Sequence, residues 1–106
     1  MSASALKNFA HEDENTTSQS WKMYEESLDY EVASEIITMM ISRCSRDLWK
    51  EEHKPNQDAE RMAQIDAEMS RLWDERNNLH VDNYANIKAV IKKYGPILKA
   101  DYDAQS

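Results

Sequence analysis

The hydrophobic pattern of this chain is strongest between Leu28 and Leu48. Apolar residues recur there every three or four positions, which predicts an amphipathic helix. From Ile36 to Ile41 only Thr38 is polar, so the apolar positions cover more of the helix circumference than one neighbouring helix would bury. We therefore expect this helix to need two partners. One can come from later in the chain, and the other from a second copy or a different protein.

Two more helices are predicted after Pro55. The first has Asn56 as its cap and an apolar row formed by Met62, Ile65, Met69, Leu72 and Leu79. With Arg76 in the position between the last two, the row is spaced by alternating threes and fours. The second begins near Asp82 or Asn83 and is expected to end at Gly95, with Pro96 just beyond. The three helices are expected at about residues 20–53, 56–80 and 82–94.

The short connection around Pro55 predicts that the first two helices are antiparallel neighbours. Their apolar rows then match over four layers: Leu48 with Met62, Cys44 with Ile65, Ile41 with Met69, and Ile37 with Leu72. The same register places Arg76 beside Ser34 and Glu35, where a polar contact would fix the register of the hairpin.

The composition agrees with an all-α fold. The 106 residues include one glycine and two prolines, and 31% of them are charged. We expect a long antiparallel helical hairpin plus a third, shorter helix, arranged like a three-helix bundle. Residues 20–106 would form this single helical domain, and residues 1–19 a flexible acidic tail. The chain shows neither a secretion leader nor a membrane-spanning apolar run, so we expect a cytoplasmic protein with no membrane partner.

The net charge of −7 is unevenly distributed along the sequence. Residues 1–35 carry eight acids and two lysines, for −6, whereas residues 83–106 carry four lysines and two aspartates, for +2. An acidic chain repels phosphate, so direct binding of nucleic acid is not expected. The lysines near the end are interpreted as the solvated face of a helix: Lys88, Lys92, Lys93 and Lys99.

No pattern in the sequence predicts a catalytic, cofactor or metal site. His11, His53, His80 and Cys44 fall in different segments, without the close spacing of zinc ligands. No Glu-x-x-His pair is present, and a single glycine rules out a glycine-rich phosphate loop. Cys44 lies on an apolar helical face and is interpreted as a small buried hydrophobe. We therefore expect a protein that is not an enzyme.

Three tryptophans and six methionines are unusual in so short a chain. The tryptophans fall on the flanks of their helices, where amphipathic aromatic side chains either clasp another helix or anchor a protein interface. Methionine adapts to imperfectly matched surfaces. The candidate protein-binding residues are Met39, Ile36, Trp49, Trp73, Trp21, Tyr24, Glu25 and Glu26.

These patterns predict a non-enzymatic helical protein that binds another protein, as a regulator, inhibitor or adaptor. A homodimer is an open alternative for the surplus apolar face. A different class is an acidic mimic of nucleic acid that inhibits a DNA- or RNA-handling enzyme, as anti-defence proteins of phages and plasmids do. The acid-rich N-terminal third supports that class, but we expect the apolar face to make the contact.

Overall fold

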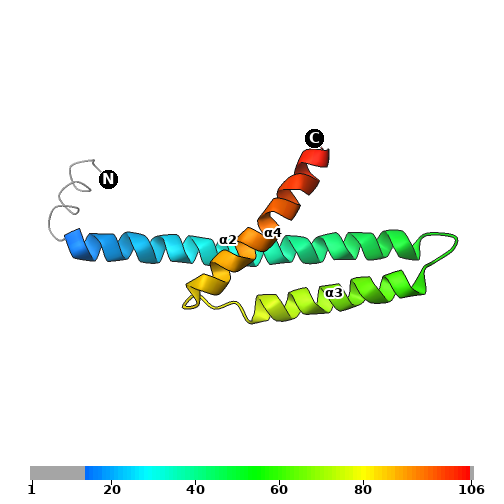
Figure 1. The fold of residues 1–106 in the computed structure, drawn as a ribbon, viewed down its shortest axis with the longest axis horizontal. Helices are drawn as coiled ribbons and strands as arrows, with labels where there is room; N and C mark the ends of the chain where they lie inside the picture. The colour runs from blue at the N-terminus through cyan, green and yellow to red at the C-terminus, as the bar shows by residue number, and fades with distance from the viewer. Residues whose placement is uncertain (1–13, 106) are drawn as a thin grey trace.

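The computed structural model describes residues 14–105, with side chains from Ser20 onward, and contains three helices. In chain order they are α2 (Glu14–Glu52), α3 (Ala59–Asn77) and α4 (Tyr84–Gln105), labelled as in Figure 1. No strand occurs in the described part of the chain, so the predicted all-α class with three helices is confirmed. The interpretation of residues 1–13 as flexible lies outside the described residues.

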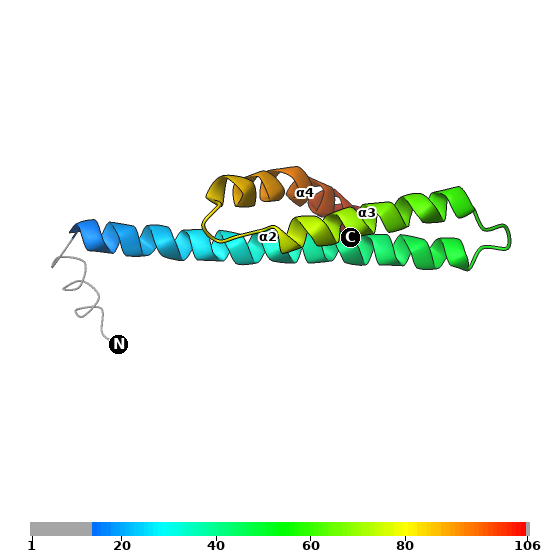
Figure 2. The ribbon, with the colours of Figure 1, turned by 90° about the horizontal axis from the view of Figure 1, so that it is seen from below.

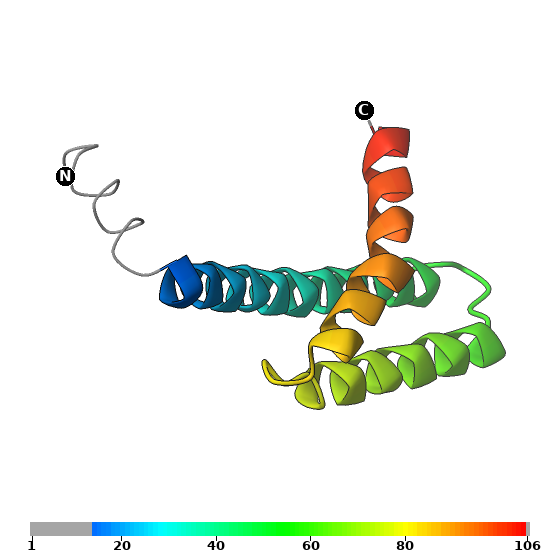
Figure 3. The same ribbon diagram turned by 60° about the vertical axis from the view of Figure 1, so that its left-hand side comes forward.

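The length of α2 determines the shape of the molecule. Its 39 residues span about 58 Å, close to the longest extent of the structure, 67 × 31 × 20 Å. The radius of gyration is 20.0 Å, against about 13 Å for a compact chain of this size. In Figure 1, α3 runs back beside the C-terminal half of α2, and α4 crosses the middle of α2 obliquely. The N-terminal part of α2 extends beyond both helices (Figure 3).

Both shorter helices pack on one side of α2, as Figure 2 shows. The core is centred on the middle of α2, where Ile37 is completely buried. The other core residues are Ala33, Ile36, Met40 and Ile41 of α2, Leu72 of α3, Leu79 just after α3, and Ile87, Val90 and Tyr94 of α4. The broad apolar arc of α2 therefore receives two neighbours from its own chain.

The predicted start of the first helix, at about residue 20, is wrong because α2 already begins at Glu14. Residues 14–19 are polar, so hydrophobic periodicity does not reveal them as helical. They contain no glycine or proline, and once a helix has nucleated on a packed segment, each added residue costs little. Glu14 also suits the positive end of the helix dipole. The predicted end near His53 agrees with the observed end at Glu52.

The second helix begins three residues later than predicted, at Ala59. Asp58, not Asn56, caps α3, with its carboxylate accepting from the backbone N–H of Arg61 at 3.0 Å. Cys44 and Ile65, which were predicted to face each other, line the same hollow between α2 and α3. Arg76 Nε donates to Thr38 Oγ1 at 3.0 Å, and that hydroxyl donates to the backbone carbonyl of Ser34 at 2.9 Å. Among the described side chains, no ion pair joins Arg76 to Glu35.

The prediction that the third helix ends at Gly95 is also wrong. α4 continues through Gly95 and Pro96 to Gln105, and at 22 residues it is longer than α3. Gly95 does not adopt the positive φ of a left-handed helix cap. Pro96 removes one backbone hydrogen bond, but its fixed φ is compatible with a helix. Leu98 packs against the core one turn later, which favours continuation.

A polar cluster joins α3 to α4 beside the core. The hydroxyl of buried Tyr94 donates to Glu75 Oε2 at 2.5 Å and accepts from Arg71 Nη1 at 3.2 Å. Arg71 also pairs with Glu68 on its own helix. The hydrogen bond with Tyr94, followed by that with Glu68, raises the pKa of Arg71, so the guanidinium stays charged. Every partner in this cluster is satisfied, and it serves to hold the two helices in place.

Replacing Gly95 by alanine tests the continuation of α4. A Cβ at this position would meet no atom within 4 Å, and the backbone is already helical. We expect Gly95→Ala to stabilise the protein by about 0.5–1 kcal/mol, because alanine loses less conformational freedom on folding. Thermal and urea unfolding followed by circular dichroism would measure the change. As a control, Ala100→Gly on the exposed face of α4 should destabilise by a similar amount. A loss of stability in Gly95→Ala would contradict a continuous helix.

Glu51 is a buried acid that ties the end of α2 to the start of α3. Its carboxylate accepts from Lys54 Nζ at 2.7 Å and from the backbone N–H of Asp58 at 3.2 Å. These two hydrogen bonds, that from Lys54 first, hold the pKa of Glu51 below its ordinary range. A lowered pKa means that the ionised form stabilises the fold above the ordinary glutamate pKa. That stabilisation is lost as the pH falls through the lowered value.

We expect Glu51→Gln to be less stable than the parent at pH 7 and to approach it as the pH falls below about 4.3. Urea unfolding from pH 7 to pH 3 would measure this difference. The neighbouring Glu52 has an exposed side chain, so Glu52→Gln should follow the parent throughout. A stability difference between Glu51→Gln and the parent that does not change with pH would show that the Glu51 charge does not hold the turn.

Candidate protein-binding surface on helix α2

A row of exposed apolar and aromatic side chains runs along α2 on the side that α3 and α4 leave bare. We call it the α2 stripe, and it consists of Trp21, Tyr24, Leu28, Val32 and Met39. The last three are 42%, 47% and 43% exposed, although their spacing of four and seven residues is that of a buried helical row. Large apolar side chains aligned on one helix face are typical of an interaction surface.

Leu28 and Val32 stand in the same four-residue repeat as the buried Met40, yet the structure exposes both. This repeat advances by four residues at each step from Leu28 to Leu48. A four-residue step turns an α-helix by about 400°, so such a row drifts by about 40° at each step. Leu28 and Met40 are therefore about 120° apart, and only the later positions face α3 and α4. Ile36 lies between the two faces and is 8% exposed.

The stripe is hollowed along its C-terminal half. Leu28, Val32, Ile36 and Met39 line a shallow groove whose charged edge is formed by Glu31 and Glu35. Met39 also lines a second hollow, where the last turns of α4 meet α2 and contribute Leu98 and Tyr102. The two hollows share Met39, so the apolar surface continues from α2 onto α4. Leu98 and Tyr102 were not among the predicted binding residues, because the third helix was expected to end at Gly95.

The N-terminal end of the stripe carries two of the predicted aromatic residues. Trp21 and Tyr24 are exposed and meet edge to face, with ring centroids 5.9 Å apart. Glu25 is exposed beside them and Glu26 is half-buried. All of these residues come from α2, and the structure brings five of the eight predicted positions onto or beside the stripe: Trp21, Tyr24, Glu25, Ile36 and Met39. Glu26 lies about 140° around the helix from Trp21, on the side that faces α4.

Trp49 and Trp73 lie elsewhere, although both are exposed as expected for flanking positions. Trp49 stacks on His53 at the tip of the hairpin, with ring centroids 4.0 Å apart. Trp73 belongs to α3, where the Arg76 guanidinium lies 5.7 Å from its ring centroid. Each ring thus has a neighbour of its own, and neither continues the stripe.

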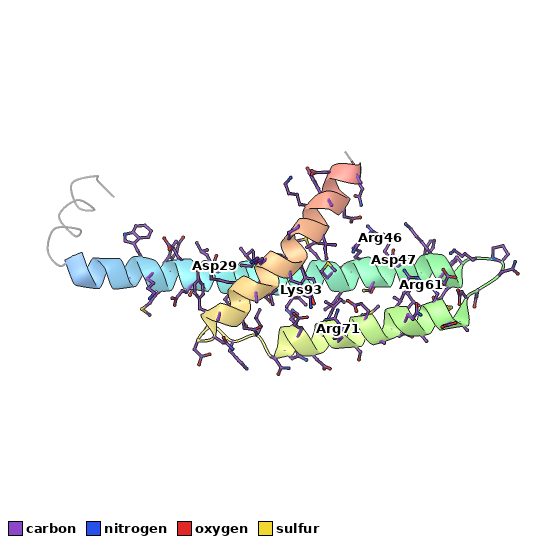
Figure 4. The ribbon with its side chains drawn as sticks, viewed as in Figure 1. Asp29, Arg46, Asp47, Arg61, Arg71 and Lys93 are labelled. Carbon is purple, nitrogen blue, oxygen red and sulfur yellow. The ribbon has the colours of Figure 1, made fainter. Side chains whose placement is uncertain are left out.

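The N-terminal half of α2 is the more acidic one: residues 14–32 carry five acids and one lysine, whereas residues 33–52 carry four acids and three basic residues. Asp29 lies in the N-terminal half, and Arg46 and Asp47 lie in the C-terminal half (Figure 4). The Asp29 carboxylate accepts from the hydroxyl of Tyr84 at 2.5 Å, and this hydrogen bond raises the pKa of Tyr84 to about 12. Arg46 Nη2 lies 3.4 Å from Asp101 of α4. These contacts hold the two ends of α4 against α2.

A separate hollow of about 350 Å³ lies between α2 and α3, and Cys44 forms part of its wall. Its rim is mostly charged and includes Asp47, Arg61 and Glu68. Cys44 is half-buried and packs against the core, so it has the structural place expected of a small hydrophobe. Burial, followed by the nearby charges of Glu68 and Asp47, raises the pKa of its thiol. A thiol of this kind is a poor nucleophile at neutral pH.

Within residues 14–105, no three His, Cys, Asp or Glu side chains gather in a way that would hold a metal ion. None of the described helices contains a segment long and apolar enough to cross a membrane. Comparisons with protein-family models, with curated proteins and with solved structures found no match to this chain.

The environment of Cys44 predicts slow modification by a thiol reagent. We expect the folded protein to react with dithionitrobenzoate at pH 7.5 more slowly than the urea-unfolded protein, because the raised pKa lowers the fraction of reactive thiolate and partial burial limits access to the sulfur. The release of thionitrobenzoate would be followed by absorbance, with free cysteine as the reference in each buffer. Equal rates in the folded and unfolded protein would mean that Cys44 is not held against the core.

Proposed function

We propose that this chain acts by binding another protein through the α2 stripe, as a regulator, inhibitor or adaptor without catalytic activity. The observation that carries the proposal is the exposure of Leu28, Val32 and Met39 in helical spacing on a face that no other described helix covers. Leaving such a row in water costs free energy that burial against a partner recovers.

The position of the stripe on α2 supports the same proposal. Because α2 is much longer than α3 and is crossed only once by α4, its N-terminal half projects from the rest of the molecule. A partner protein can contact a projecting helix from several sides without disturbing the core. Trp21 and Tyr24 add large aromatic area near its end, and aromatic residues are enriched among those that dominate binding energy.

The second candidate function is mimicry of nucleic acid, and exposed acids on the same half of α2 favour it. Glu25, Glu31 and Glu35 are exposed, whereas the carboxylate of Asp29 is held by Tyr84. An enzyme that handles DNA or RNA would then be the partner. The two functions differ in which side chains carry the contact, since mimicry depends on the acids and the first proposal on the apolar row.

The proposal predicts that Leu28→Ser combined with Val32→Ser abolishes binding while leaving the fold intact. Both side chains are already exposed, so the variant should keep the circular dichroism spectrum and melting temperature of the parent. The tagged chain would be used to capture its partner from the source cells, and the partner's affinity would then be measured. Removing two central apolar contacts should weaken binding by roughly tenfold or more.

Met23→Ser is the matched control, because Met23 is exposed but lies about 200° around the helix from Trp21. It should bind like the parent. Undiminished binding by the double variant, with loss of binding in Glu25→Gln and Glu31→Gln and competition by duplex DNA or RNA, would replace the proposal with mimicry of nucleic acid.

A further inference from the structure

The acids beside the α2 stripe indicate which kind of partner segment the stripe takes. Residues 14–42 contain six acids and one lysine, for a net charge of −5. Glu31 and Glu35 form the edge of the groove that holds Leu28 and Val32, and Glu25 lies on the other side of the stripe by helical phase. The apolar row is therefore flanked by negative charge on both sides.

The chain itself does not neutralise these flanking acids. Among the described side chains, no ion pair reaches Glu25, Glu31 or Glu35. The nearest arginines along α2, Arg43 and Arg46, come after Met39 and pair with Asp101 of α4. A partner with basic residues on both sides of an apolar row would supply the missing charges as it covers the apolar side chains.

We propose that the α2 stripe binds an amphipathic helix of a partner protein, whose apolar row is flanked by lysines and arginines. This inference rests on the proposed function and specifies the partner. From Trp21 to Met39 the stripe spans 18 residue steps, or about 27 Å, so the partner segment would be about five helical turns long. At the Met39 end, the apolar surface continues onto Leu98 and Tyr102 of α4, which the end of the partner segment would contact.

A helix fits this surface better than an extended segment does. The backbone N–H and C=O groups of α2 are used within the helix, so α2 offers no edge for a β-strand to join. The spacing of three, four, four and seven residues along the stripe matches the anchor positions of an opposing helix. Packing of this kind places the flanking charges of the two helices opposite one another.

A second copy of the chain fits less well, although the apolar positions would match. An antiparallel pair centred on Tyr30 would bring Trp21 opposite Met39 and Leu28 opposite Val32. The same pairing brings Glu25 opposite Glu35 of the other copy, and like charges across such a seam oppose association. The apolar side chains of the stripe could pack against a second copy or against a partner helix. The acids beside the stripe favour the partner helix with basic residues.

The test uses the full chain and a synthetic 21-residue helical peptide with Leu at its a and d positions and Lys or Arg at its e and g positions. A second peptide keeps the apolar row and has Glu at e and g. Binding would be measured by anisotropy of a fluorescent label on each peptide. We expect the basic peptide to bind at least tenfold more tightly than the acidic one. We also expect the bound chain to show slowed hydrogen exchange in the first half of α2.

Charge reversal locates the contact. Glu31→Lys combined with Glu35→Lys should weaken binding of the basic peptide at least tenfold. Glu60→Lys combined with Asp66→Lys makes the same change in net charge on the exposed face of α3 and should leave binding within twofold of the parent. Equal losses in the two variants would overturn the inference, because net charge rather than the groove would then govern binding.

Three results separate this inference from the proposed function. If both peptides bind equally and both lose affinity in Leu28→Ser with Val32→Ser, the stripe binds helices without selecting basic ones, so this inference fails and the proposed function stands. If sedimentation shows a dimer that the same double variant abolishes, a second copy is the occupant and the inference is overturned. If neither peptide binds and the double variant captures the natural partner normally, both proposals fail.

Discussion

The burial of one side of α2 between Ala33 and Ile41 is the interaction on which the rest of the structure depends. α3 and α4 both pack against this segment, and their own backbones do not pack closely against each other. Their direct link is made by side chains, with Tyr94 of α4 held between Arg71 and Glu75 of α3. Completely buried Ile37 and Leu72 show how tightly this centre is packed. Any change that loosens the middle of α2 would therefore release both neighbours together.

The sequence predicted what depends on apolar periodicity and helix-breaking residues. Three helices and an end near His53 followed from the spacing of isoleucine, leucine and methionine and from Pro55. The start of α2 could not be found in this way, because residues 14–19 are polar and are helical only by extension of a packed segment. The end of α4 was missed because Gly95 and Pro96 usually stop a helix. Here the packing of Leu98 one turn later outweighs that preference.

The sequence predicted which residue types form the candidate site, but not which of these residues share one face of the molecule. The tryptophans and Met39 were named as candidates, with packing against another helix left open for the tryptophans, and the structure exposes all four side chains. Leu28 and Val32 share a four-residue repeat with the buried Met40, but such a repeat winds around the helix by about 40° per step, so the repeat alone does not show which of its members are buried. A count of angular phase along α2 would have separated the buried face from the stripe. The contribution of α4 at the Met39 end depends on where the chain crosses, which no local pattern encodes.

The hydrogen bond between Tyr84 and Asp29 has a consequence for the cooperativity of α2. It attaches the first turn of α4 to α2 just before the buried segment begins at Ala33. C-terminal to it, each turn of α2 shares its stability with α3 or α4, whereas N-terminal to it the backbone hydrogen bonds of the helix stand alone. α2 is thus one continuous helix whose two parts differ in stability. The part after Asp29 is stabilised by packing against α3 and α4, and the part before Asp29 is not. A protein that bound the part of α2 before Asp29 would stabilise that part through new packing contacts. Binding would then be coupled to folding of this segment.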